Sequence, residues 1–263
     1  MSGPSAQVEP VLARLAPVTL AEIQELADLQ TRVDRKYVVP ARIVAEMLAE
    51  QGGLKVLEIG GRRRFGYESV YFDTPGLDSY RGAAHGRRRR FKVRTRSYAD
   101  SGECVVEVKV AGGRGETVKE RLGYERAAAA ALDERARGFA EEVLTQTLPD
   151  ARTVVATLAA TLVTTYDRST LVDPDAGTRL TCDSSLLCAA AGPGGTTPAG
   201  TAGLGDQVVL ESKSPGPATP VDRWLWARGY RPVRLSKYCV GLAALDRTLP
   251  SNRWSRTLRR HVR

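Results

Sequence analysis

The stretch Arg90-Phe-Lys-Val-Arg-Thr-Arg-Ser-Tyr98 decides the fold, because its residues alternate strictly between two kinds of side chain. Basic residues occupy every second position, and Phe, Val and Thr occupy the positions between them, which is the two-residue period of a β-strand. The next segment, Cys104-Val-Val-Glu-Val-Lys-Val110, alternates in the same way after a turn at Ser101-Gly102. The two segments predict an antiparallel hairpin with one charged face and one apolar face.

Similar strands are predicted along the rest of the chain, with helices between them. Strand-like segments occur at 31–39, 54–59, 64–72, 164–172, 178–187 and 207–212. Helical segments occur at 20–29, 40–51, 124–148, 151–160 and 217–228. Turn sequences such as Asp73-Thr-Pro-Gly76 separate several of them. The pattern predicts an α+β protein with about eight antiparallel strands.

Cations recur on one face of these strands. The 263 residues include 39 Lys and Arg against 30 Asp and Glu, a formal charge of +9. Only seven residues are Lys, and five of them lie in strand-like motifs: Lys36, Lys92, Lys109, Lys213 and Lys237. On an open sheet such charges would simply be solvated. In a closed barrel they would converge and repel, unless a polyanion and a divalent metal neutralised them. Both interpretations remain open at this point, and a bias of composition toward Arg explains much of the remaining excess.

Several functional classes are excluded. No run approaches the roughly 18–20 apolar residues of a membrane span, and the N-terminus lacks the pattern of a signal peptide. Four Cys and two His show no metal-ligand spacing, so a bound metal would rest on carboxylates, which favours Mg²⁺ or Mn²⁺. No aromatic stacking motif accompanies the basic strands, so we expect no nucleic-acid partner.

The chain divides into three predicted parts. Residues 1–19 are expected to be a flexible lead-in, 20–248 a single domain, and 249–263 a basic tail. Within the domain, 189–205 is rich in Ala, Gly, Pro and Thr and is expected to be a mobile loop, because such a composition cannot bury a core.

Six motifs, taken in order, resemble the VTC domain, the polyphosphate polymerase family within the CYTH-like, triphosphate tunnel metalloenzyme superfamily. They are Asp34-Arg-Lys-Tyr37, Tyr71-Phe-Asp-Thr-Pro-Gly-Leu-Asp-Ser-Tyr80, Arg90–Tyr98, Glu107-Val-Lys109, Glu211-Ser-Lys213 and Ser236-Lys-Tyr238. The resemblance implies a closed antiparallel β-barrel tunnel of about eight strands with helices packed outside. One departure is Arg32-Val-Asp34-Arg-Lys36, where the wider superfamily has Glu-x-Glu-x-Lys. The missing first acid fits the VTC branch and leaves fewer metal ligands.

The resemblance also implies roles for individual residues. Catalytic lysines would be Lys36, Lys109, Lys213 and Lys237. Phosphate-binding residues would be Arg94, Arg96, Arg168 and Arg179, with Lys92 and Arg90. Glu211 would bind Mn²⁺ or Mg²⁺, with Glu107 or Asp183 as a second ligand, although Glu107 fits a structural ion pair equally well. Asp34 would pair with a tunnel cation.

The implied activity is transfer of the γ-phosphate of ATP to a growing inorganic polyphosphate chain. The alternatives are a tunnel-type triphosphatase or tripolyphosphatase, a nucleotidyl cyclase, and a polyphosphate or nucleotide sensor without turnover. The resemblance implies a stand-alone protein with ATP and polyphosphate as partners. It would lie in the cytoplasm or at the inner face of the membrane, where export would need a separate membrane protein.

Overall fold

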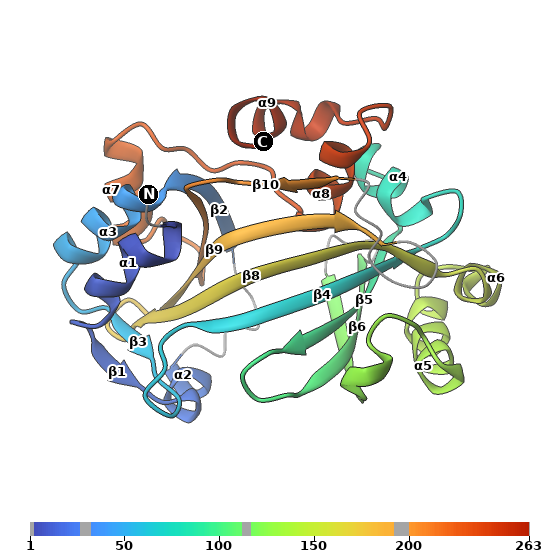
Figure 1. Ribbon diagram of the computed structural model, residues 1–263, viewed down its shortest axis with the longest axis horizontal. Helices are drawn as coiled ribbons and strands as arrows, with labels where there is room; N and C mark the ends of the chain where they lie inside the picture. The colour runs from blue at the N-terminus through green and yellow to red at the C-terminus, as the bar shows by residue number, and fades with distance from the viewer. Residues whose placement is uncertain (1–2, 27–32, 112–116, 192–199, 263) are drawn as a thin grey trace.

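The computed structural model describes residues 3–26, 33–111, 117–191 and 200–262. Its main feature is one large, mostly antiparallel sheet with the strand order β2-β11-β9-β8-β4-β5-β6-β7 (Figure 1). These strands are β2 (Val33–Pro40), β4 (Phe65–Asp73), β5 (Arg90–Tyr98), β6 (Cys104–Ala111), β7 (Thr117–Tyr124), β8 (Ala159–Asp173), β9 (Thr178–Ala190) and β11 (Gln207–Ser214). The short strands β1 (Ala16–Val18), β3 (Lys55–Leu57) and β10 (Thr201–Gly203) pair at its margins.

The predicted hairpin is β5 paired with β6, and its two faces differ as the alternation requires. Val93 and Val108 lie opposite each other, are fully buried, and belong to a core cluster with α5 (Glu134–Thr145) and α6 (Ala151–Ala156). Arg94 and Glu107 lie opposite each other on the other face. The apolar face is therefore the outer one, covered by helices, and the charged face lies on the concave side of the sheet.

The sheet does not close into the predicted barrel. β2 and β7 are the two ends of the strand path and do not pair with each other within the described residues. The free edge of β2 is instead met by the segment before α8, where the Val233 N–H donates to the Lys36 carbonyl at 2.7 Å. We call the unpaired edges of β2 and β7 the seam.

The sheet nevertheless curls strongly, so that strands from its opposite ends approach one another. Burial and the neighbouring Arg121 lower the pKa of Lys119 on β7 to about 8, and the charge of Lys213 on β11 contributes to that shift. Because a charge acts on another in this way only at short range inside a protein, Lys119 and Lys213 lie near enough to feel each other's charge.

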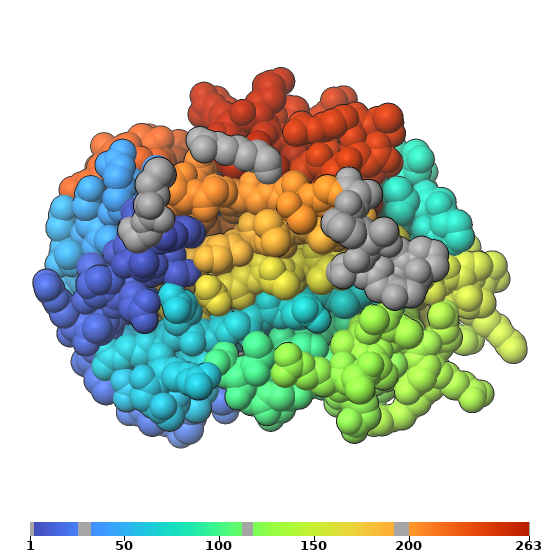
Figure 2. All heavy atoms as spheres, viewed as in Figure 1, coloured from blue at the N-terminus to red at the C-terminus, as the bar shows by residue number. Residues whose placement is uncertain are grey.

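Three groups of helices surround the sheet (Figure 1). The first is α1 (Pro4–Leu12), α3 (Ala41–Glu50) and α7 (Pro220–Ala227), and the second is α5 and α6. The third is α4 (Asp78–Ala84), α8 (Lys237–Leu245) and α9 (Ser255–His261). Between the first two groups, β8 and β9 reach the surface in the space-filling view (Figure 2). The remaining helical elements are α2 (Leu20–Leu26), η1 (Arg126–Ala128) and η2 (Asn252–Trp254).

The helix α8 occupies one end of the concave side. It belongs to a core cluster that includes Tyr71 and Val209, whose sequence neighbours Val70 and Val208 belong to outer-face clusters instead. Because successive residues of a strand point to opposite faces, Tyr71 and Val209 point inward. The concavity is thus apolar and filled at the end where α8 packs, and charged over the remainder.

The terminal segments are more ordered than their composition predicts. Residues 4–12 of the expected flexible lead-in form α1, because Val8 and Leu12 lie four residues apart and are both buried against the α3 side of the core. In the expected basic tail, Trp254 and Leu258 are buried beside Tyr80. Of the predicted mobile loop, 192–199 lies outside the described residues. None of the described helices is long and apolar enough to cross a membrane.

Asp73, at the end of β4, anchors two helices to the sheet. Its buried carboxylate accepts backbone N–H groups of Thr74, Ser79 and Tyr80 at 2.8–2.9 Å and the Tyr238 hydroxyl at 2.6 Å. Thr74 precedes α4, Ser79 and Tyr80 lie in its first turn, and Tyr238 lies in the first turn of α8. Burial raises the pKa of Asp73, and its four donors oppose that rise. One side chain thus positions both α4 and α8.

We expect Asp73→Ala to lower the free energy of unfolding by about 3 kcal/mol or more, because it leaves buried N–H donors without an acceptor. Tyr238→Phe, which removes a single O–H donor, should cost about 1.5 kcal/mol. Urea denaturation followed by tryptophan fluorescence gives both values. Equal losses in the two variants would show that the backbone donors contribute little to the anchor.

Candidate functional site

The concave face gathers the cations that the alternation predicts. Strand pairing aligns Arg168 with Asp183, Lys36 with Glu211, and Lys213 with both Arg179 and Asp34. It aligns Lys92 with Lys109 and Arg94 with Glu107 on the other half of the sheet. Lys237 reaches the same face from the first residue of α8, through an ion pair with Asp183. The sheet therefore brings the expected residues to one side, with Arg90 at the first position of β5, on the face of Lys92.

Three lysines stand side by side across β5, β6 and β7. Lys92 pairs in register with Lys109, and Lys109 with Lys119. Directly opposite residues in antiparallel strands have Cβ atoms about 5 Å apart, and like charges at that spacing are destabilising. Burial and the charges of Arg94 and Lys92 lower the pKa of Lys109 to about 6. An anion bound at this row would relieve the repulsion among the three lysines, so the row favours an anionic ligand.

Glu107 holds three arginines on the adjacent row. Its carboxylate is 1% exposed and accepts from Arg94 Nε at 2.7 Å and from Arg121 Nε at 2.9 Å, while Arg96 lies 3.7 Å away. Burial would raise the pKa of Glu107, but Arg94 and Arg96 hold it well below its usual range. Both carboxylate oxygens thus face guanidinium groups, which corresponds to the ion-pair alternative for this residue.

Asp183 is a second buried carboxylate, and it binds two cations. Arg168 donates to its two oxygens through Nε at 2.6 Å and a terminal nitrogen at 2.8 Å, a bidentate geometry, and Lys237 forms an ion pair with it. Asp183 is 2% exposed. Burial would raise its pKa, but Arg168 and Lys237 hold it well below its usual range. The planar fork of Arg168 is therefore fixed before any ligand arrives.

Glu211 is the third inward carboxylate and differs from the other two in its partners. Lys36 lies 3.7 Å and Lys213 3.9 Å from Oε1, distances at which the ion pairs are looser than those of the arginines. Burial would raise the pKa of Glu211, but these two lysines lower it to about 2. Asp34 lies on the same face of β2, two residues from Lys36. Glu211 is thus ionised and accepts no hydrogen bond from a guanidinium group of the described residues.

The described residues contain no group of three or more Asp, Glu, His or Cys side chains that would hold a metal by themselves. A hard divalent ion such as Mg²⁺ often takes one or two carboxylates and completes its shell with substrate phosphates. The oxygen donors of Glu211, with Asp34 nearby on the same face, fit that second kind of site.

Three tyrosines lie among the inward cations. Arg94 lies 5.6 Å from the centre of the Tyr71 ring, Arg96 5.5 Å from that of Tyr67, and Lys237 4.2 Å from that of Tyr166. Cations over aromatic faces gain about 0.5–2 kcal/mol each. The tyrosines thus offset part of the repulsion while no anion is bound.

Five buried polar atoms lack a hydrogen-bond partner within the described residues, and all belong to inward-facing side chains: Ser69 Oγ, Arg96 Nε, Thr164 Oγ1, Tyr166 Oη and Thr181 Oγ1. Buried polar groups in native proteins are almost always paired. Their concentration on this face leaves unused hydrogen-bonding capacity among the inward cations.

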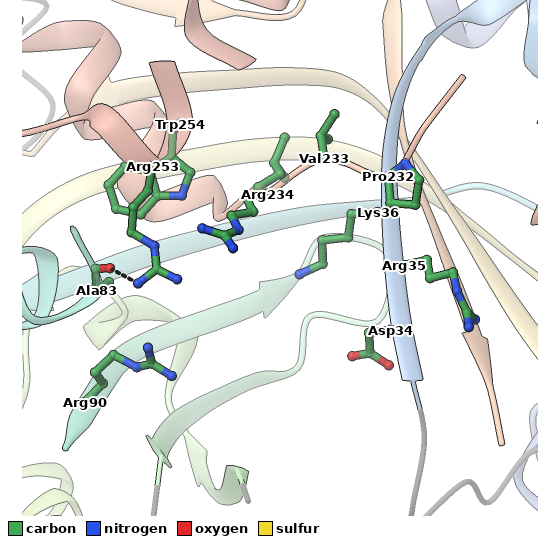
Figure 3. A pocket seen from close by; sticks show the side chains of 11 residues that line it. Asp34, Arg35, Lys36, Ala83, Arg90, Pro232, Val233, Arg234, Arg253 and Trp254 are labelled. Carbon is green, nitrogen blue, oxygen red and sulfur yellow. Dashed lines mark hydrogen bonds between the residues drawn. The ribbon is translucent and has the colours of Figure 1, made fainter. Parts of the chain in front are cut away.

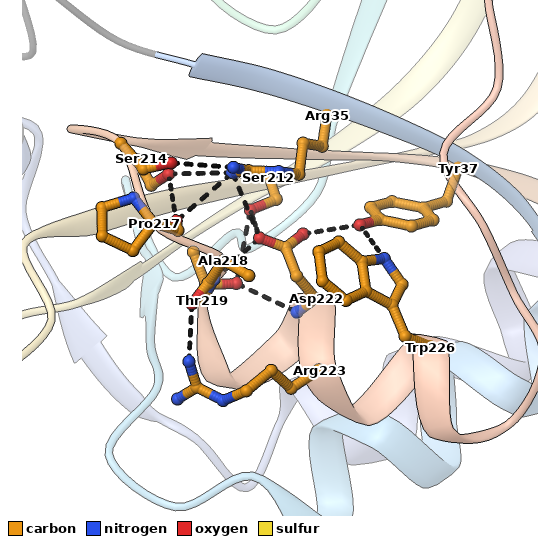
Figure 4. Close-up of polar contacts among 11 residues, drawn as sticks. Arg35, Tyr37, Ser212, Ser214, Pro217, Ala218, Thr219, Asp222, Arg223 and Trp226 are labelled. Atoms are coloured by element: carbon orange, nitrogen blue, oxygen red, sulfur yellow. Dashed lines mark hydrogen bonds and ion pairs between the residues drawn. The ribbon is translucent and has the colours of Figure 1, made fainter.

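Residues flanking Lys36 point the other way and fix its position. Arg35 donates to the carbonyl of Gly216 at 2.7 Å, and Tyr37 donates to Asp222 at 2.8 Å (Figure 4). Asp222 also closes the capping box of α7 with Thr219. Because β2 is locked to α7 on its outer face, Lys36 is held on the inner one.

A pocket of about 370 Å³ opens beside the free edge of β2. Lys36 and Arg90 line it, together with Arg234 and Arg253 (Figure 3). Arg90, predicted as a phosphate-binding residue, thus lies here, away from the Glu107 and Asp183 clusters.

Sequence reasoning missed several members of the site. The Gly-rich segment 111–123 is absent from the predicted strands, yet β7 begins at Thr117 and adds Lys119 and Arg121. The alternation Val118, Lys119, Glu120, Arg121, Leu122 was a usable signal. The inward tyrosines had the same two-residue period, but an aromatic at such a position is more often core.

Comparisons with known proteins agree with this architecture. A family model described as the VTC domain matches residues 31–246. A search of curated proteins gave no match. Among solved structures, the chain is similar to a putative adenylyl cyclase, HpAC1, from Hippeastrum, described as revealing a dominant triphosphatase activity. The identity is 14%, the TM-score is 0.51, and the match covers 82% of this chain and 99% of that one.

Two further solved structures are more distant in shape. The PH1819 protein from Pyrococcus horikoshii is 13% identical with a TM-score of 0.44, and the match covers 82% of this chain and 98% of that one. A putative adenylate cyclase from Vibrio parahaemolyticus is 14% identical with a TM-score of 0.38, over 83% of this chain and 87% of that one.

We expect tripolyphosphate binding to be coupled to proton uptake by Lys109. At about pH 7.5 a lysine with a pKa near 6 is mostly neutral, and an adjacent polyanion raises that pKa again. Binding should therefore weaken as the pH rises above 6. Calorimetry in two buffers of different ionisation enthalpy should show about one proton more taken up by the native protein than by Lys109→Met. Equal uptake by the two proteins would contradict this assignment.

The substitution Glu107→Gln tests whether this carboxylate acts as a structural ion-pair partner or as a metal ligand. We expect the free energy of unfolding to fall by about 3 kcal/mol, because three guanidinium groups lose their shared counter-charge. Tripolyphosphate should then raise the thermal unfolding temperature of the variant more than that of the native protein. Unchanged stability, combined with loss of metal-dependent ligand binding, would instead favour a metal-ligand role.

Proposed function

Since the chain belongs to the VTC domain family, we propose that it is a metal-dependent phosphotransferase. It would transfer the γ-phosphate of ATP to the end of an inorganic polyphosphate chain held on the concave face.

One observation carries the proposal: three of the inward carboxylates, Glu107, Asp183 and Glu211, are each bound by two or more cations. Glu107 pairs with three arginines, Asp183 with Arg168 and Lys237, and Glu211 with Lys36 and Lys213. A carboxylate with a pKa lowered by cations is a poor base for activating water. The terminal phosphate of polyphosphate is already anionic and needs no base. The site thus favours an acceptor that arrives charged.

The cations would divide into two roles. Arg94 and Arg168 are already fixed by carboxylates, so they would present rigid N–H groups to phosphate oxygens without reordering. Arg96, whose Nε has no partner within the described residues, would bind a non-bridging oxygen directly. Arg179 and Lys92 would contact the outer phosphates of the triphosphate.

The lysines would act where charge changes during transfer. Lys36, Lys109, Lys213 and Lys237 would stabilise charge that develops on the transferred group and the leaving oxygen. Lys119, which extends the row of Lys109, would join them. A divalent ion at Glu211 would supply charge neutralisation between neighbouring phosphates. Asp34 would keep Lys213, its partner in register, correctly placed.

A triphosphatase is the second candidate. The unpartnered hydroxyls of Ser69, Thr164, Tyr166 and Thr181 are suited to hold water on the inner face. The fold is shared with HpAC1. Water held by hydroxyls alone would remain a weak nucleophile, so we rank hydrolysis second.

Incubation with ATP and Mn²⁺ or Mg²⁺, followed by a polyphosphate gel and a free-phosphate assay, separates the candidates. We expect long chains, and Lys237→Met should reduce their rate about 100-fold or more, since it removes a fixed positive charge near the transferred group. Arg259→Gln, on an exposed position of α9, is the matched control and should retain the native rate. Free phosphate without polymer would support the triphosphatase, and neither product would contradict both enzymes.

A further inference from the structure

The pocket beside the free edge of β2 has a basic lining that the reacting triphosphate does not account for. Its walls come from β2, the start of β5, the segment 232–235 and η2 (Figure 3). Four cations extend into it: Lys36, Arg90, Arg234 and Arg253. Asp34 is the one carboxylate among the described residues that line it. Arg35 also borders the pocket, but its side chain is turned to Gly216 and Asp222.

These cations are available to a ligand. Neither Arg90 nor Arg234 forms a side-chain hydrogen bond or ion pair within the described residues, and Arg234 is exposed. Arg253 donates one N–H to the Ala83 carbonyl at 3.1 Å, which leaves its other N–H groups for a second partner.

Arg253 is also held in place by the backbone of the loop beneath it. A Cβ added at Gly86 would lie 2.5 Å from a terminal nitrogen of Arg253. The Arg253 guanidinium therefore fits against this backbone only because residue 86 has no side chain. Trp254 next to it is 5% exposed and packs on Tyr80 with ring centroids 5.8 Å apart. The buried Trp254 and the backbone at Gly86 thus hold Arg253 in position at the pocket.

Lys36 connects the pocket to the inner face. It lines the pocket and pairs with Glu211, the proposed metal ligand, at 3.7 Å. A linear polyanion that leaves the inner face past Lys36 would therefore meet Arg90, Arg234 and Arg253 next.

We propose that this pocket is a second binding subsite for linear inorganic polyphosphate, holding phosphates of the chain several units away from its reacting end. The identity of the chain rests on the proposed function, whereas the subsite itself rests on the pocket and its cations. The chain would reach the subsite past Lys36, beside the edge of β2. Arg253 lies beyond the residues matched by the family model.

The test is equilibrium binding of three probes without turnover: long-chain polyphosphate, tripolyphosphate, and ATP without metal. Arg234→Gln/Arg253→Gln removes two charges from the pocket. Arg256→Gln/Arg259→Gln removes two charges from exposed positions of α9 that do not line it. Thermal unfolding confirms that both double variants are folded.

We expect the pocket variant to bind long-chain polyphosphate about tenfold or more weaker than the α9 variant, since charge-assisted contacts are the stronger kind. Its affinity for tripolyphosphate should stay within about twofold of the native value. An equal loss in both double variants, or no loss in either, would overturn the subsite. Loss of ATP affinity with unchanged affinity for both polyphosphates would assign the pocket to the nucleoside and overturn it too.

The subsite and the proposed function can be refuted independently of each other. If the native protein makes no polymer but the pocket variant alone loses long-chain binding, the polymerase proposal fails and the subsite stands. If polymer forms and both variants bind long chains as the native protein does, the subsite fails and the polymerase stands.

Discussion

The rest of the structure depends on how like charges are held together on the concave face of one sheet. Cations this close repel each other strongly where the dielectric constant is low. Three carboxylates make the arrangement possible, because each is shared among several cations and stays ionised. Removing one of them would leave its cations without compensation, which usually costs more than the intact ion pair contributes.

The carboxylates neutralise the arginines of the site more completely than the lysines. Arg94 and Arg168 have tight, direct partners, so they keep a single geometry. The lysine row has none of comparable strength, and its middle member, Lys109, has a pKa lowered to about 6. For Lys109 the folded pKa lies below the unfolded one. The unfolded chain therefore binds more protons between about pH 6 and pH 10, and this residue makes the protein more stable as the pH rises through that range. The protein carries a local destabilisation that an anion would relieve, so ligand binding and stability are coupled.

Sequence predicted the parts of the fold that depend on local alternation. The hairpin of β5 and β6 and its two unlike faces follow from a period of two, and so does the inward placement of Lys36, Arg96 and Lys109. Closure was not predictable in this way, because it depends on which segment reaches the free edge of β2. That segment contains Val233 and lies nearly 200 residues further along the chain. The role of Glu107 was also open, since a strand pattern gives its face and not the partners that reach it from two neighbouring strands.

The pocket beside β2 bears on the kind of substrate that we propose for this fold. A closed barrel admits a chain only through its ends, and here α8 fills one end with apolar side chains. A short triphosphate needs one open end, whereas a growing polymer must leave while its reacting terminus stays bound. The pocket beside β2, lined by Lys36, Arg90, Arg234 and Arg253, would give such a polymer a place to bind away from its reacting end. Under the proposed function, an elongating product would thus leave past this pocket while its reacting end stays bound.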